Sequence, residues 1–142
     1  MEDLVRAVLR FRDEREWRQF HNPKDLAISI TLEAAELLAK EGIDVEVIDL
    51  RTLNPLDTTT VFESVRRTGR AAVVTEAHKT LGMSAELSAL IHENCGGSLV
   101  APVMRIAGED VPVPATYLEQ FAIPRADDIV SRSIRLVRGG QD

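Results

Sequence analysis

The stretch DLAISITLEAAELLAKEGIDVEVIDL, residues 25–50, decides the fold because its first part is compatible with two structures. Isoleucines alternate there with small or polar residues, a pattern that is typical of a half-buried strand. The same stretch also follows the spacing of one helix face, from Leu26 to Leu37 and on into EAAELLAKEG. Because Pro23 suits the first turn of a helix, we predict one continuous helix over residues 24–41. A strand that leads into a shorter helix is the alternative.

The overall composition fits one compact domain with an appendage. The chain has 142 residues, 44% of them hydrophobic, and a formal net charge of −6. This net negative charge argues against a broad surface that binds nucleic acid or anionic membranes. No apolar run approaches the roughly 20 residues that are needed to span a bilayer. The single cysteine, Cys95, excludes an internal disulfide and a zinc site built from several cysteines. Together with the charged N-terminus it predicts a cytoplasmic protein.

Further along the chain, strands and helices alternate, which predicts an α/β fold: a three-layer sandwich with a mainly parallel sheet. The continuous apolar run at residues 70–77 is typical of a buried parallel strand. Residues 43–50 are also predicted as a strand, because apolar and polar residues alternate. Its apolar positions are Ile43, Val45, Val47 and Leu50. A third strand is predicted at residues 102–108.

The predicted helices are marked by capping residues. An N-terminal helix at residues 3–20 precedes the one at 24–41, and the two form a helical hairpin. Three further helices follow in the α/β part. One starts at Asp57 or Thr58 and stops at Gly69, the next ends at Gly96, and the last opens near Pro124 and closes at Gly139.

Three motifs carry a resemblance to a known family: EAAELLAKEGIDVEVIDLRTLNPLD, TGRAAVVTEAHKTLGMSAELSALI and APVMRIAGEDVPVPATYLEQFAIPRADDIV. Residues 32–137 resemble the C-terminal domain of the β subunit of thiamine-dependent 2-oxo acid dehydrogenases, a domain shared with acetoin dehydrogenase and the transketolase group. The resemblance implies that residues 39–142 form the corresponding α/β domain. It also implies a role in subunit assembly and, by analogy with some complexes, docking of an acyltransferase.

A second resemblance precedes the first. The segment RFRDEREWRQFHNPKDLAISITLEAAELL contains Trp-x-Gln-Phe-His-x-Pro followed by a Glu-x-x-Glu pair. Residues 1–38 thereby resemble the N-terminal helices of MazG-like and dCTP-type nucleotide pyrophosphohydrolases. The letters EAAELL fit both families, so we predict a chimera of two parents joined there, whether natural or engineered.

Four residues are candidates for pyrophosphohydrolase chemistry. Glu33 and Glu36 are three apart, so on a helix both carboxylates project from one face, where they suit Mg²⁺. The resemblance implies that Trp17 and His21 line a nucleobase pocket. The second acidic pair that completes the metal cage in that family is missing, so we expect only weak Mg²⁺ binding. The alternatives are an exposed acidic stripe for the glutamates, helix packing for Trp17 and a polar helix end for His21.

The sequence thus contains only part of the active site of each family that it resembles, and we expect no catalysis. The sequence has no Gly-Asp-Gly diphosphate-binding motif, so we expect no thiamine diphosphate in the isolated chain. We predict a non-catalytic α/β domain that folds and self-associates as a homodimer or larger assembly, because a sheet interrupted by a foreign hairpin exposes apolar surface. The alternatives are a Mg²⁺-dependent nucleoside triphosphate pyrophosphohydrolase and a docking module of a thiamine-dependent dehydrogenase complex.

Overall fold

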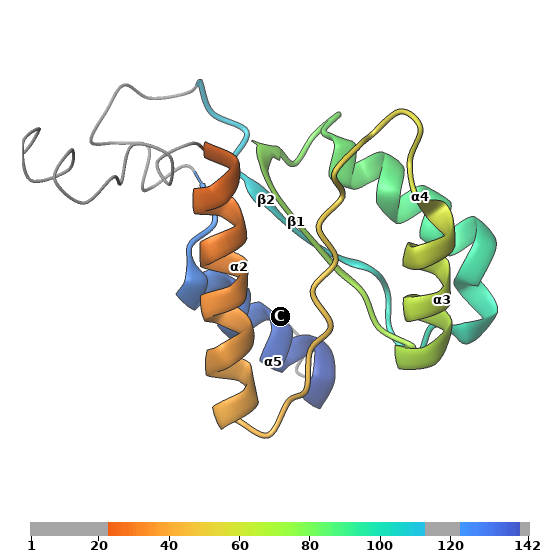
Figure 1. The fold of residues 1–142 in the computed structure, drawn as a ribbon, viewed down its shortest axis with the longest axis horizontal. Coiled ribbons are helices and arrows are strands. Elements are labelled where there is room, and N and C mark those ends of the chain that lie inside the picture. Colours follow the sequence, from red (N-terminus) through yellow and green to blue (C-terminus); the bar gives the residue numbers. More distant parts are fainter. Residues whose placement is uncertain (1–22, 113–122, 140–142) are drawn as a thin grey trace, which may run out of the picture.

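The computed structural model describes residues 23–112 and 123–139, so the predicted helix at 3–20 lies outside the described residues. Element labels follow Figure 1. In chain order the described elements are α2 (Pro23–Lys40), α3 (Thr58–Thr68), β1 (Ala72–His78), α4 (Met83–Cys95), the short 3-10 helix η2 (Gly96–Ser98), β2 (Met104–Gly108) and α5 (Ala126–Arg138). Among these elements, none is a helix long and apolar enough to cross a membrane.

α2 settles how the first quoted stretch folds: it is one uninterrupted helix, as predicted. Its inward side carries Ala34 and Leu38, which are almost completely buried. The helix ends where Gly42 takes a positive φ of 75°, a conformation that costs glycine little because it has no Cβ. The amide of Ile43 then donates to the carbonyl of Leu38, at 2.9 Å, and closes the turn.

β1 and β2 form a parallel two-stranded sheet in which Ala72 lies opposite Met104. α2 and α5 cover one face of the sheet, and α3 and α4 cover the other (Figure 1). This three-layer α/β arrangement confirms the predicted fold class. α4 is the crossover between the strands, because parallel strands need a long connection to run in the same direction.

The two sides of the sheet hold separate clusters of buried side chains. Beneath α2 and α5 the cluster consists of Ala34, Ile106 and Ile129. Beneath α3 and α4 it consists of Val61, Val65, Ile91, Cys95 and Val103. Cys95 is therefore a buried thiol, and its Sγ lies 3.8 Å from the carbonyl oxygen of Phe62.

The prediction of a strand at residues 43–50 was wrong. In the described part of the chain the sheet consists of β1 and β2, and residues 43–50 form an extended segment without a ladder. Of the apolar positions named for this strand, Leu50 does pack against the cluster under α3 and α4, together with Ile48, whereas Val45 and Val47 are exposed. Because side chains alternate along an extended chain, a change of one residue in phase reverses which set is buried.

β1 confirms the strand predicted at residues 70–77, but its burial was overestimated. Val73 and Val74 are half-buried, and the last three residues of the strand are exposed. The physical reason is that β2 pairs with β1 along one edge only among the described residues. A strand with one paired edge is less enclosed than the interior strand that a continuous apolar run indicates.

Helix ends were predicted more accurately than strands. The Asp57 side chain caps α3 by accepting from the amide of Thr60 at 3.1 Å. Gly69 and Gly139, in left-handed conformation, end α3 and α5. α4 ends at Cys95, directly before Gly96. Capping depends on residues close in sequence, so these helix ends can be predicted without knowledge of the tertiary structure.

Candidate functional site

The carboxyl ends of β1 and β2 are joined by a polar clamp. Ligands of open α/β folds bind outside the carboxyl ends of the strands, so this end of the sheet is the first place to look for a site. The amide of Thr80 donates to Asp110 Oδ1 at 2.9 Å, and its hydroxyl donates to Asp110 Oδ2. These hydrogen bonds, the hydroxyl contributing most, lower the pKa of the Asp110 carboxyl. Asp110 is therefore held as a carboxylate that fixes the loop after β1.

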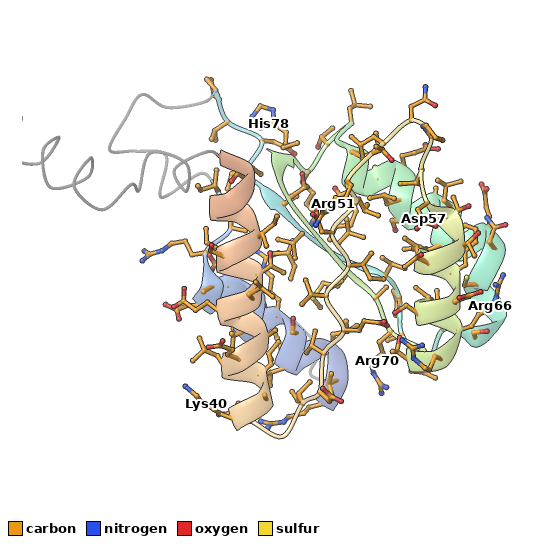
Figure 2. The ribbon with its side chains drawn as sticks, viewed as in Figure 1. Lys40, Arg51, Asp57, Arg66, Arg70 and His78 are labelled. Carbon is orange, nitrogen blue, oxygen red and sulfur yellow. The ribbon has the colours of Figure 1, made fainter. Side chains whose placement is uncertain are left out.

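Backbone contacts tighten the same loop. The amide of Lys79 donates to the carbonyl of Gly108 at 3.0 Å. The guanidinium of Arg105 donates to the carbonyl of Lys79 at 2.9 Å. The register between the strands shifts between Thr75 and His78, as in a β-bulge, and such irregularities redirect side chains at strand ends. Figure 2 shows His78 at the end of the molecule where α2 begins.

Leu81, in the clamped loop, combines two unusual features. Its φ of 58° is left-handed, a conformation that costs a non-glycine residue roughly 1–2 kcal/mol. Its side chain is 97% exposed, so within the described chain it gains no burial in return. Strain that persists at an exposed apolar residue is a reason to suspect an interaction there.

Gly82 links this loop to α4 and allows a very close approach. A Cβ built on Gly82 would lie 2.1 Å from the carbonyl oxygen of His78, a distance that no side chain tolerates. Gly82 is also the N-cap of α4, with no side chain to accept a hydrogen bond from the first turn. The loop from β1 to α4 is thus compact because residue 82 is glycine.

A second polar cluster anchors the extended segment to α3. Glu46 accepts hydrogen bonds from the hydroxyl of Ser64 and from the guanidinium of Arg67. The Ser64 hydrogen bond, followed by Arg67, lowers the pKa of the Glu46 carboxyl. Residues 43–50 are therefore held against the domain by side chains while their backbone forms no ladder.

The predicted metal ligands, Glu33 and Glu36, both lie on the exposed side of α2. Glu33 lines a hollow between α2 and the start of α5, together with Arg125 and Asp127, but Glu36 does not line it. Within the described residues no three His, Cys, Asp or Glu side chains lie close enough to hold a metal ion. Trp17 and His21, the predicted nucleobase contacts, lie outside the described residues, so the nucleobase pocket stays a prediction.

The clamp and the exposed leucine were not found from the sequence. Thr80 and Asp110 are 30 residues apart, but each follows the end of a predicted strand. Because the carboxyl ends of parallel strands lie at one edge of a sheet, the positions of Thr80 and Asp110 after two such strands could have predicted their contact. The positive φ of Leu81 left no such signal, since leucine rarely adopts it.

Comparison with known proteins agrees with the fold. The sequence profile of the family described as Transketolase, C-terminal domain, matches residues 27–129. The chain is 48% identical over 109 residues to pyruvate dehydrogenase E1 component subunit beta-1, mitochondrial, of Arabidopsis thaliana, covering 76% of this chain and 30% of the relative. It is 41% identical over 117 residues to acetoin:2,6-dichlorophenolindophenol oxidoreductase subunit beta of Cupriavidus necator, covering 82% and 35%.

A solved structure supports the same assignment. The chain superimposes on a split-gene transketolase, described as an inactive beta4 tetramer, with a TM-score of 0.65 and 28% sequence identity. The aligned part covers 78% of this chain and 35% of that one. The chain thus spans about a third of the length of the curated relatives it matches. Through residues 27–129, it belongs to the transketolase C-terminal domain family.

Proposed function

We propose that this chain is a non-catalytic assembly module, which self-associates through the extended segment beside the sheet. The observation that carries the proposal is the exposure of Val45, Val47 and Leu53, with 36% to 52% of each residue accessible. Ile48 and Leu50 hold the segment against the buried cluster, and Glu46 fixes it to α3. The segment therefore offers apolar side chains in a fixed position and, among the described residues, an extended backbone that joins no strand ladder, which is how an exposed edge recruits another chain.

The relatives give this proposal further support. The printed names of two of them describe β subunits, and the structural neighbour is described as a tetramer of β chains. A second copy of this chain is the simplest partner, because a two-fold interface uses the same surface on both protomers. Pairing of two such segments would place Val45 and Val47 of one copy beside those of the other.

We further propose that the MazG-like part of residues 1–38 is the portion before the family match begins at residue 27, and that no pyrophosphohydrolase activity came with it. In support, Glu33 and Glu36 do not line the same hollow: Glu33 lines one together with Asp127, and Glu36 is not among its lining residues. Two exposed carboxylates hold Mg²⁺ weakly, because the ion needs near-octahedral oxygen ligands supplied by protein and substrate together.

Sedimentation velocity over a series of protein concentrations tests the assembly role. The chain should sediment faster as concentration rises, and the double variant Val45→Lys/Val47→Lys should remain a monomer because two charges would face each other at the interface. Val100→Lys is the matched control, because Val100 is also exposed but lies outside the extended segment. A wild-type chain that stays monomeric at every concentration would refute the self-association.

Hydrolysis of dCTP with Mg²⁺ tests the absence of catalysis. We expect the same background rate for the chain and for Glu33→Gln. Turnover that Glu33→Gln abolishes would show that the acidic pair is a working metal site and would contradict the proposal.

A further inference from the structure

Two neighbouring hollows lie where the end of β2 meets the first turn of α5. One, which we call the β2 hollow, has a volume of about 130 Å³ and lies between the end of β2 and α5. The other, which we call the α2 hollow, has a volume of about 270 Å³ and lies between α2 and the start of α5. Ile123 and Pro124 line both hollows, so the two adjoin. Together they reach the range of about 300–1,000 Å³ that is usual for small-molecule sites.

The β2 hollow is lined by charges of both signs that do not pair with each other. Glu109, directly after β2, and Asp128, in the first turn of α5, contribute carboxylates, and Arg132, one turn further along α5, contributes a guanidinium. No nitrogen of Arg132 lies within 4.0 Å of a carboxylate oxygen of Glu109 or Asp128. Among the described residues, the half-buried Arg132 and the exposed Glu109 have no hydrogen-bond or ion-pair partner.

Opposite charges that line one hollow without touching are complementary to a zwitterion. A guanidinium binds a carboxylate through two parallel hydrogen bonds, and a protein carboxylate accepts hydrogen bonds from an ammonium group. Both interactions are stronger at a protein surface than in bulk water, because the effective dielectric constant is roughly 20 there and about 80 in water. The β2 hollow therefore suits a molecule that carries an ammonium group and a carboxylate close together, as an α-amino acid does.

The groups of the β2 hollow are held in place before any ligand binds. The amide of Arg125 donates to Asp128 Oδ2 at 3.1 Å, which fixes this carboxylate at the start of α5. Ile106 closes the base of the hollow and belongs to the buried cluster under α2 and α5. Because these groups are already ordered, a ligand loses less of its binding energy to the ordering of the protein.

The α2 hollow is the more apolar of the two. Four of its lining residues are apolar: Ile30, Ala126, Ile123 and Pro124. Ile30 and Ala126 also pack against the buried cluster, so this side of the hollow is continuous with the core. An aliphatic side chain that lies there leaves water, which is favourable. The charged lining residues, Glu33, Asp127 and Arg125, carry a net negative charge that disfavours an acidic side chain.

We propose that the two hollows form one binding site for an α-amino acid with an aliphatic side chain. The carboxylate of the ligand binds Arg132, and its ammonium group lies between Glu109 and Asp128. Its side chain extends past Ile123 and Pro124 into the α2 hollow. The site lies outside the carboxyl end of β2, where open α/β sheets bind ligands. It does not involve residues 43–53, so this proposal and the self-association can fail independently.

Leucine is the probe, and proton–nitrogen correlation spectra of the full chain are the readout. Titration with leucine should shift the amide signals of Ala107 and Asp128, whereas those of Ser64 and Glu93, on the other face of the sheet, should stay in place. Two analogues separate the contacts: isopentylamine is leucine without its carboxylate, and isocaproate is leucine without its ammonium group. Each should bind at least about tenfold more weakly than leucine, because one charge-assisted interaction is lost.

Substitutions in the β2 hollow should affect leucine and its analogues differently. Arg132→Gln should weaken leucine binding by about tenfold or more, but it should not weaken the binding of isopentylamine, which has no carboxylate. Glu109→Gln should weaken the binding of leucine and not that of isocaproate. Arg66→Gln and Glu93→Gln are the matched controls, because both residues are exposed and lie on α3 and α4. Both controls should bind leucine as the wild type does.

Three results would overturn the proposal. The first is a leucine titration that shifts no signal at the two hollows. The second is isopentylamine binding as tight as that of leucine. The third is an equal loss of leucine and isopentylamine binding in Arg132→Gln, because the substitution would then act through the structure of the hollow and not through the carboxylate of the ligand.

Discussion

Gly82→Ala is the substitution for which the structure makes the sharpest prediction. The backbone of Gly82 has φ −78° and ψ 162°, a conformation that alanine adopts without strain. The whole cost therefore comes from the added Cβ, which would lie 2.1 Å from the carbonyl oxygen of His78. The obstacle is backbone, and it belongs to a strand end that is held by the clamp, so it cannot rotate away as a side chain would.

The magnitude follows from this geometry. Overpacking usually costs about 1–3 kcal/mol, and a collision between backbone atoms belongs at the upper end of that range. A loss of about 3 kcal/mol in a domain of this size lowers the melting temperature by roughly 10 °C. Gly96→Ala is the matched control, because Gly96 has helical dihedrals and nothing lies within 4 Å of an added Cβ. Gly96→Ala should stabilise the fold by about 0.4–1 kcal/mol, because alanine lowers the conformational entropy of the unfolded chain.

Urea denaturation followed by far-UV circular dichroism measures both variants under identical conditions. The two denaturation midpoints should move in opposite directions from that of the wild type. A Gly82→Ala midpoint equal to the wild-type value would refute the reasoning, because it would mean that the loop after β1 yields at no cost. The close packing assigned to the loop between β1 and α4 would then be wrong as well.

Two further predictions concern stability. Ile106→Ala should lower the free energy of unfolding, measured by urea denaturation, by about 2–5 kcal/mol. The reason is that it leaves a cavity in the cluster between β2, α2 and α5, where Ile106 is 1% exposed. A loss smaller than that of a surface substitution such as Val100→Ala would contradict the assigned core. Asp57→Ala should lower the denaturation midpoint at pH 7, because it removes the cap of α3. Hydrogen bonds from the Thr60 hydroxyl and, second, from the Thr60 amide lower the pKa of the Asp57 carboxyl in the folded state. The stabilisation from this cap is therefore complete above the unfolded pKa of about 4, and it is lost as the pH falls through the folded pKa. The difference between Asp57→Ala and the wild type should therefore shrink in acid, and a difference that grows there would refute this assignment.

Local chemistry explains which parts of the fold could be predicted. Asp57 caps α3 through contacts three residues away, and Gly69 and Gly139 end their helices by adopting a positive φ. α2 could be predicted because its apolar spacing is unbroken and Pro23 opens it. In each case the decisive signal lies within the element itself and needs no distant partner.

The errors arose where a distant partner decides the structure. Residues 43–50 have the alternation of a strand, but an alternating sequence becomes a strand only when a neighbouring backbone pairs with it. Which side of the segment faces the core was decided by the packing of Ile48 and Leu50 beneath α3, which the sequence does not encode locally. The same holds for the candidate site, because the Thr80–Asp110 clamp spans 30 residues.

The contact between α2 and α5 has a consequence for synthesis on the ribosome. The ion pair between Glu41 and Arg138 joins residues 97 positions apart. At the usual pace of about 5–20 residues per second, α2 emerges roughly 5–20 s before its partner helix has been made. During that time the side of α2 that carries Ala34 and Leu38 has no permanent cover, and it is then that the growing chain most needs protection from aggregation.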